Sequence, residues 1–125
     1  MSQSIDKNVL GGPLEACSME PLTGFFRDGC STTGPMDLGS HTVCAEVSAE
    51  FLEYSRRNGN DLITARPEFN FPGLKPGDRW CLCAARWNEA YDAGVAPPVV
   101  LRATNAAAQR VVELDTLIQH SADDG

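Results

Sequence analysis

No stretch of this 125-residue chain approaches the roughly 20 consecutive apolar residues that a membrane-spanning helix requires. The start of the chain also lacks an apolar run behind basic residues, so we expect no secretory signal peptide. Basic side chains are few, with 10 Lys and Arg against 17 Asp and Glu and a net charge of −7. Because phosphate backbones and anionic membranes are bound largely through Lys and Arg, we expect neither a nucleic acid nor a membrane as partner.

Familiar catalytic motifs are missing as well. No glycine-rich fingerprint follows a predicted strand, and neither a Gly-x-Ser-x-Gly elbow nor a phosphate-binding loop occurs. Histidine is scarce, because the chain has only His41 and His120. His120 stands near the C-terminus, where we expect the chain to fray. His41 is therefore the principal candidate for a histidine base or ligand.

The five cysteines are an odd number in a chain for which we expect no export signal. Disulfide frameworks belong to oxidising compartments, whereas the thiols of cytosolic proteins stay reduced. We therefore predict a cytoplasmic protein with five free thiols and no disulfide. The cysteines are Cys17, Cys30, Cys44, Cys81 and Cys83.

The length is that of one ordinary domain, so we predict a single compact domain over residues 1–125, frayed at 1–7 and 121–125. The first forty residues are rich in glycine and proline, which predicts a loop-rich region packed on the rest. Strands then alternate with short helices, so the predicted fold class is α+β, with a mixed β-sheet flanked by helices. The sheet is predicted from residues 41–47, 79–84 and 98–103, and its covering helices from 49–58 and 84–93.

Local signals define several of these elements. Ser48 stands at the N-cap position of the first helix, and Gly59 supplies its C-terminal glycine. Pro76 and Gly77 occupy the two central positions of a predicted type II turn before the second strand. Near the C-terminus we predict a short helix capped by Thr104, a short strand at 111–114, and a last helix at 116–120 capped by Asp115.

Several long strings together resemble one family of small, mostly bacterial proteins known only as a domain of unknown function. The resemblance covers residues 8–120 and implies no reaction, cofactor or partner, so no catalytic residue carries over from it. Members often have a second cysteine after the position of Cys30, where this chain has Ser31, which puts a mechanism based on a Cys-Cys pair in doubt. The strings are Asn8–Leu14, Thr23–Cys30, Asp37–Cys44, Ala96–Leu101 and Phe71-Pro-Gly-Leu-Lys-Pro-Gly-Asp-Arg-Trp-Cys-Leu-Cys-Ala84.

The Cys-Leu-Cys unit allows two kinds of chemistry. On a strand, Cys81 and Cys83 point to the same face, so they could converge on a zinc ion with Cys44 and His41 as further ligands. Alternatively, one of these thiols is a nucleophile or redox group with His41 as its base. The structural alternative is that the cysteines only fill the core as small apolar side chains.

A second group of residues combines arginine with flat aromatic side chains in or beside the loop-rich segments. Such a combination is typical of pockets for small carboxylates or phosphates. The structural alternative is that the arginines form local ion pairs while the phenylalanines close the core. The candidate ligand-binding residues are Arg27, Arg66, Arg79, Phe69 and Phe71.

The sequence alone thus leaves the function open between three classes. We expect a small cytosolic domain that binds a small anionic ligand or a metal, with zinc as the metal to test. The second class is an enzyme with a cysteine nucleophile or redox thiol among Cys81, Cys83 and Cys44, acting with His41. The third is a structural protein that acts as a homo-oligomer.

Overall fold

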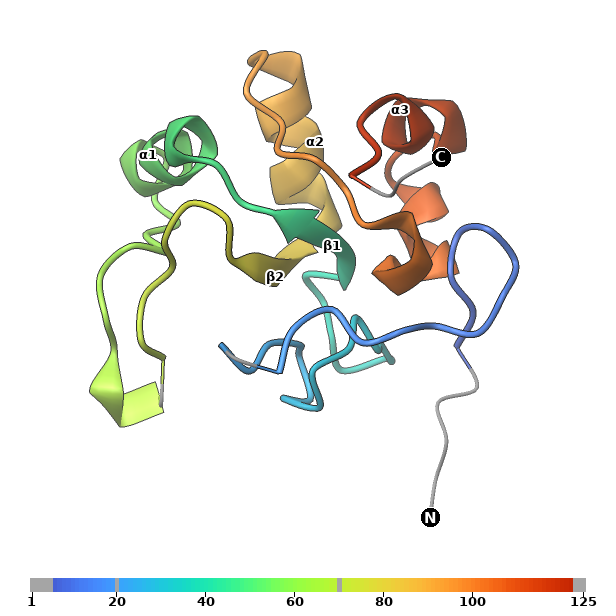
Figure 1. The fold of residues 1–125 in the computed structure, drawn as a ribbon, viewed down its shortest axis with the longest axis horizontal. Coiled ribbons are helices and arrows are strands. Elements are labelled where there is room, and N and C mark those ends of the chain that lie inside the picture. Colours follow the sequence, from blue (N-terminus) through green and yellow to red (C-terminus); the bar gives the residue numbers. More distant parts are fainter. Residues whose placement is uncertain (1–5, 20, 70, 123–125) are drawn as a thin grey trace.

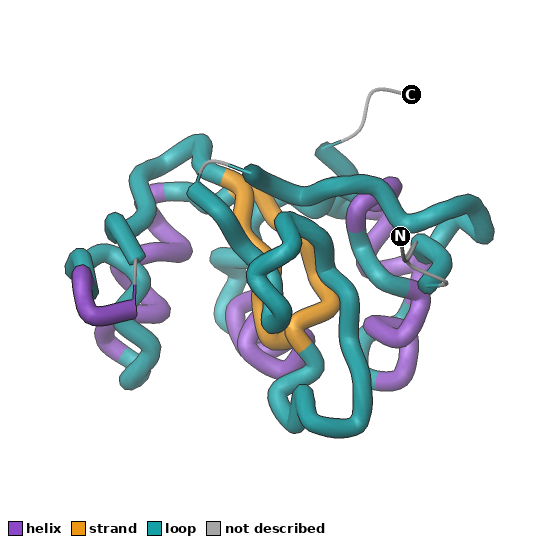
Figure 2. The backbone as a smooth tube through the Cα atoms, turned by 90° about the horizontal axis from the view of Figure 1, so that it is seen from below, coloured by secondary structure: helices purple, strands orange, loops and turns teal. Residues whose placement is uncertain are grey.

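The computed structural model describes residues 6–19, 21–69 and 71–122. A two-stranded antiparallel sheet lies at its centre, made of β1 (His41–Glu46) and β2 (Arg79–Cys83). The α-helices stand on one side of the sheet, and the loop-rich N-terminal region crosses the other side (Figures 1 and 2). This arrangement confirms the α+β class. The α-helices within the described residues are α1 (Ala49–Arg57), α2 (Ala84–Asp92) and α3 (Leu114–Gln119).

The first helix and the turn before β2 form as their local signals predict. The Ser48 hydroxyl accepts a hydrogen bond from the N–H of Phe51 at 3.1 Å, and Gly59 takes a φ of 88° after the helix ends. Before β2, the N–H of Asp78 donates to the Lys75 carbonyl at 3.0 Å, and Gly77 has a φ of 98°. A positive φ at the third position is what a type II turn requires.

The third strand of the predicted sheet is wrong, because only the start of its segment pairs with β1. Val99 forms an isolated antiparallel bridge with Ala45. The chain then turns into a 3₁₀ helix, Leu101–Ala103. The Thr104 hydroxyl donates to the Val100 carbonyl at 2.9 Å, and so draws the backbone out of the extended path that a strand would need.

The C-terminal elements also differ from the prediction in their caps. Asn105, rather than Thr104, caps the 3₁₀ helix Ala106–Arg110, because its side chain accepts from the N–H of Ala107 at 2.8 Å. Residues 111–114 form no strand, and α3 begins at Leu114, so that Asp115 lies inside its first turn. Short polar segments of this kind are decided by the surfaces on which they pack, and those surfaces are distant in sequence.

The predicted frayed ends fall mainly outside the described residues, which exclude 1–5 and 123–125. Within the described part, Lys7 bridges Pro13, and Ser121 forms a parallel bridge with Val99. The sheet of β1 and β2 is antiparallel, and this isolated bridge is the parallel pairing within the described residues. A mixed sheet would contain a parallel strand instead.

The sheet separates two cores. On the helix side, Leu82 and Trp87 belong to the large apolar core, in which α1 and α2 also bury their inner faces. On the loop side, Cys44 and Cys81 belong to a second, small core with Val100. The alternation of Cys81 and Leu82 between the two cores follows from the twofold side-chain period of a strand, as the sequence predicts.

Candidate functional site

One disulfide ties the loop-rich region to the sheet. Cys17 and Cys44 are bonded across a sequence separation of 27, with their Cα atoms 5.7 Å apart. The prediction that the protein contains no disulfide is therefore wrong, and the free cysteines are Cys30, Cys81 and Cys83. The pairing depends on the path of the N-terminal loops, which brings Cys17 against β1. Neither cysteine count nor spacing encodes that path.

A β-bulge at the start of β1 places His41 directly opposite Cys83. A regular antiparallel ladder, extended from the pairing of Val43 with Leu82, would place Thr42 at that position. The register shifts between His41 and Val43, so His41 is the residue paired with Cys83 instead. Bulges commonly re-aim side chains beside active sites. The bulge thus sets the backbone of His41 opposite that of Cys83, and both residues line one hollow.

A buried carboxylate holds the His41 ring. A hydrogen bond of 2.7 Å joins Asp37 Oδ1 to His41 Nδ1, and the Asp37 side chain is 0% exposed. Its Oδ2 accepts from the His41 backbone N–H at 2.8 Å and from the Thr33 hydroxyl at 3.0 Å. Burial by itself raises the pKa of Asp37, but the hydrogen bonds from His41 and Thr33 outweigh it and hold that pKa below its usual value. An ionised Asp37 accepts from Nδ1–H, which leaves Nε2 to act as a base.

Close packing restricts the imidazole further. A Cβ atom at Gly39 would lie 2.9 Å from Cε1 of His41, so only glycine allows this approach of the turn to the ring. Ser40, the next residue, has a φ of 49°, which is uncommon for a residue other than glycine. The Phe25 ring stacks on His41 with 6.1 Å between ring centroids. The ring is therefore positioned from three sides while 40% of the His41 side chain stays exposed.

Cys83 ends β2 and is also the N-cap residue of α2. The N–H groups of a helical first turn carry partial positive charge and point past the N-cap residue. The Cys83 side chain makes no hydrogen bond to these groups in this structure. Cys83 is partly exposed, so a small molecule can reach its sulfur.

Two hollows, of about 250 and 230 Å³, share His41, Trp80 and Cys81 and are here called together the His41 groove. Cys83, Leu62, Asn60 and Arg86 line the first hollow, and Gly24, Phe25 and Arg27 line the second.

Each hollow of the His41 groove contains one guanidinium group. Arg27 lies over the Trp80 ring at 5.4 Å from its centroid and donates to the Leu22 carbonyl at 3.0 Å. Among the residues that the structure describes, no carboxylate forms a salt bridge with Arg27. Arg86 donates to the Asn58 carbonyl at 3.1 Å and contacts Glu89 at 3.5 Å. Arg27 is thus the more available cation for an anionic ligand.

Cys81 differs from Cys83 in its surroundings. Its sulfur is buried and accepts a hydrogen bond from the Ser31 hydroxyl at 2.8 Å. Burial raises the pKa of Cys81 to about 11, so this thiol is protonated at neutral pH. Burial also raises the pKa of Cys30, with a further contribution from the Asp28 charge. Neither group has the environment of an activated nucleophile.

The predicted zinc ligands do not converge as a set. The sulfur of Cys44 is bonded to Cys17, which removes it from the predicted group of Cys81, Cys83, Cys44 and His41. Within the described ranges, no group of three or more His, Cys, Asp or Glu side chains is placed to hold a metal ion.

The predicted anion-binding residues are divided between two places. Arg27 lines the His41 groove, whereas Arg66 and Phe71 form a bridge within the long loop before β2. Phe71 is buried against Trp80, with 5.1 Å between ring centroids. Phe69 is 66% exposed, and Arg79 lies 3.7 Å from Glu46 across the strand pair. Ligand binding by these four residues stays a prediction.

Asp37 is the residue of this site that sequence reasoning missed. Its position four residues before His41 is a weak signal, because the pair is close in the sequence without lying on a predicted helix. The turn that brings the two side chains together depends on Gly39 and Ser40, and their conformations became visible only in the structure.

The fold and the site define a small α+β protein with one disulfide and a histidine that is hydrogen-bonded to a buried carboxylate and paired with Cys83 in the strand register. Residues 7–121 match the family described as "uncharacterized protein conserved in bacteria" (DUF2237), and the chain belongs to this family, as its sequence strings indicated. A comparison with curated proteins finds no match. No helix among the described residues is long and apolar enough to cross a membrane.

Proposed function

We propose that this protein is a thiol-dependent enzyme in which Cys83 is the nucleophile, His41 its general base and Asp37 the residue that orients the base. The observation that carries the proposal is the bulge that sets His41 opposite Cys83, together with the Asp37–His41 hydrogen bond of 2.7 Å. A nucleophile, a base within reach and a third group that orients the base are the parts that covalent catalysis requires.

The reaction class that fits these parts is acyl transfer. His41 Nε2 takes the proton from Cys83, and the sulfur forms a bond to the carbonyl carbon of a small ester or thioester. The bond to the leaving group then breaks, and the alcohol or thiol departs with the proton that His41 returns. The first-turn N–H groups of α2 favour the developing oxyanion. Water, deprotonated by His41, then hydrolyses the acyl-cysteine and restores the thiol.

The cations in the His41 groove support an anionic substrate. Arg27 and Arg86 lie in the two hollows that share His41, so a carboxylate or phosphate on the substrate has a guanidinium partner near either end. The small volume of each hollow favours a small molecule over a polymer. A cytoplasmic setting, and partners that exclude nucleic acids and membranes, stay predictions that belong with this proposal.

Alkylation rates test the nucleophile. Iodoacetate and iodoacetamide both alkylate thiolates with loss of iodide, but only iodoacetate carries a negative charge. We expect Cys83 to be labelled before the other cysteines. The ratio of its iodoacetate rate to its iodoacetamide rate should exceed the same ratio for a small free thiol. In Arg27→Gln the two ratios should be equal. Cys30→Ser is the matched control, because it removes a partly exposed thiol outside the proposed pair. First labelling at Cys30, or equal rates in native and unfolded protein, would contradict the proposal.

Release of nitrophenolate tests the reaction. With p-nitrophenyl hemisuccinate, an anionic ester, we expect a burst that Cys83→Ser abolishes and that His41→Gln slows by about 100-fold or more. Mass spectrometry should find the succinyl group on Cys83. If the parent protein released nitrophenolate no faster than Cys83→Ser, and the two proteins had the same circular dichroism, this reaction class would be excluded.

A further inference from the structure

Three sulfur atoms meet in the small core on the loop side of the sheet. Cys17, Cys44 and Cys81 belong to this core, and we call them the sulfur cluster. Cys44 is already bonded to Cys17, while Cys81 is a free thiol. Cys81 also lines the His41 groove, but the acyl-transfer steps involve none of these three cysteines.

The backbone shows that Cys44 and Cys81 face each other closely. They are paired in the register of β1 and β2, so their side chains lie on the same face of the sheet. The backbone groups of Cys44 turn away from β2, because its N–H donates to the Thr104 hydroxyl and its carbonyl accepts from Val100. The N–H of Cys81 likewise turns away from β1, toward the Thr23 hydroxyl at 2.9 Å. The two residues therefore form a pair without mutual backbone hydrogen bonds.

This kind of pair is compatible with a disulfide. Directly opposed residues without mutual hydrogen bonds have Cα atoms about 4.5 Å apart. Disulfides span Cα separations of roughly 4.4–6.8 Å, so the strand pair meets this requirement for a Cys44–Cys81 bond without moving apart. Cys44 is thus bonded to Cys17 on the loop and directly opposite Cys81 on the neighbouring strand.

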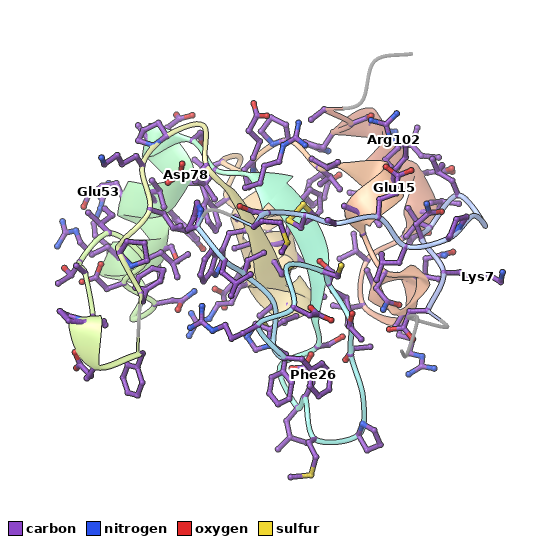
Figure 3. The ribbon with its side chains drawn as sticks, turned by 60° about the horizontal axis from the view of Figure 1, so that its bottom comes forward. Lys7, Glu15, Phe26, Glu53, Asp78 and Arg102 are labelled. Atoms are coloured by element: carbon purple, nitrogen blue, oxygen red, sulfur yellow. A yellow bond between two sulfur atoms is a disulfide. The ribbon has the colours of Figure 1, made fainter. Side chains whose placement is uncertain are left out.

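The loop that carries Cys17 also covers Cys81. Thr23 binds the Cys81 N–H and Ser31 binds its sulfur, and both residues belong to the loop-rich region that the disulfide anchors. Just before Cys17 in the same region, Glu15 contacts Arg102 at 3.7 Å (Figure 3). The segment therefore has an attachment besides the disulfide. Loss of the Cys17 bond would free one anchor of the cover over the sulfur cluster while leaving another in place.

We propose that the sulfur cluster is a thiol–disulfide exchange site in which Cys81 displaces Cys17 from Cys44. The Cys81 sulfur loses its proton and forms a bond to the Cys44 sulfur. The bond between Cys44 and Cys17 breaks, and the Cys17 sulfur leaves with its electron pair and takes up a proton. One disulfide and one thiol are present before and after the step, so no oxidant or reductant is consumed. The exchange replaces a disulfide between the N-terminal loop and β1 with a disulfide between β1 and β2.

The surroundings of Cys81 keep this exchange slow at neutral pH. Burial, and to a smaller extent the charges of Cys30 and Asp28, raise the pKa of Cys81, whereas the hydroxyls of Ser31 and Thr23 act in the opposite direction. Because only the thiolate attacks a disulfide, the rate of exchange increases about tenfold per pH unit below that pKa. Opening of the loop lowers the barrier further by exposing the sulfur.

Disulfide mapping of the intact protein tests the exchange. The oxidised protein is incubated without oxygen at pH 7, 8 and 9, with N-ethylmaleimide present to trap any released Cys17 thiol. We expect Cys17 labelling and a Cys44–Cys81 linked peptide to increase together, about tenfold faster per pH unit. In Cys81→Ser, Cys17 should stay unlabelled, whereas Cys83→Ser should show the same rate of Cys17 labelling as the parent chain. Unlabelled Cys17 at every pH, with circular dichroism unchanged, would overturn the proposal.

A second variant tests the geometry without requiring the exchange. In Cys17→Ser, Cys44 and Cys81 are both thiols, and oxidised glutathione supplies the oxidant. We expect a Cys44–Cys81 disulfide, formed with release of two equivalents of reduced glutathione. Two glutathionylated or unreacted cysteines, or a bond to Cys30 instead, would overturn the proposal. Neither result requires a reactive Cys83, so failure of the exchange proposal is distinct from failure of the acyl-transfer proposal.

Discussion

At the scale of single residues, the site depends on how the turn before β1 holds one imidazole. Asp37 binds the ring nitrogen, Gly39 lies against the ring edge and Phe25 stacks on its face. Gly39 and Phe25 also line the His41 groove, whereas Asp37 acts on the chemistry through the position of His41.

Gly39→Ala tests this positioning. The added methyl group would lie 2.9 Å from Cε1 of His41, so we expect the ring to shift and Cys83 alkylation to slow by about 10-fold or more. Gly12→Ala is the matched control, because its added Cβ would meet the Asn8 side chain at an ordinary 3.7 Å. The measurement is the rate of iodoacetate labelling at Cys83 as a function of pH. Equal rates in both variants would show that the ring does not need this packing.

The Asp37 carboxylate predicts a pH dependence of stability. Its pKa is lower in the folded protein than in the unfolded chain, where it is about 3.9. Its stabilising contribution is therefore fully present above the unfolded value and is lost as the pH falls through the lower folded value. We expect denaturant unfolding between pH 6 and 2.5 to show a steeper loss of stability in the parent chain than in Asp37→Asn. Parallel curves would contradict the assignment.

At the scale of elements, a single hydroxyl decides where the sheet ends. Thr104 is fully buried, donates to the Val100 carbonyl at 2.9 Å and accepts from the Cys44 N–H at 3.1 Å. It thereby connects the 3₁₀ segment after Val100 to β1 and replaces part of the strand pairing that the apolar sequence predicts.

Thr104→Val keeps the shape of this side chain but removes both hydrogen bonds. Because it leaves a buried N–H and a buried carbonyl short of a partner, we expect a loss of about 1–3 kcal/mol in the free energy of unfolding. Thr116→Val, at a partly exposed position of α3, provides the control and should change that free energy by less than about 0.5 kcal/mol. Equal effects of the two substitutions on urea unfolding would show that the Thr104 hydroxyl contributes nothing.

At the scale of the whole molecule, the loop-rich region has few regular elements and is attached to the sheet largely through its side chains. The disulfide is the covalent part of this attachment, and it closes a sequence separation of 27. By the loop-closure entropy of the unfolded chain, such a bond contributes about 3.5 kcal/mol.

Reduction of the disulfide should therefore lower the free energy of unfolding by about 3.5 kcal/mol. The measurement is urea unfolding of the protein with and without dithiothreitol. The Cys17→Ser variant, kept away from oxidants so that all its thiols stay reduced, should match the reduced parent protein and show no further change with reductant. If reduction left the midpoint and slope unchanged, the bond would not constrain the unfolded chain as proposed.

The local part of this structure was predictable because its causes lie within a few residues of the chain. The Ser48 cap, the Pro76–Gly77 turn and the alternation of Cys81 and Leu82 all depend on nearest neighbours or on a fixed strand period. The sequence strings were also sufficient to indicate the family. His41 was singled out because the chain offers only one other histidine, and its role in a site stays a prediction.

The tertiary structure alone decided which groups meet. The Cys17–Cys44 bond, the bulge that sets His41 opposite Cys83 and the burial of Asp37 each depend on segments whose relative path is fixed by packing. A one-residue shift in strand register exchanges Thr42 for His41 at the position facing Cys83, and no local propensity distinguishes the two. The residues of the site were therefore present in the sequence, whereas their pairing is a property of the folded chain.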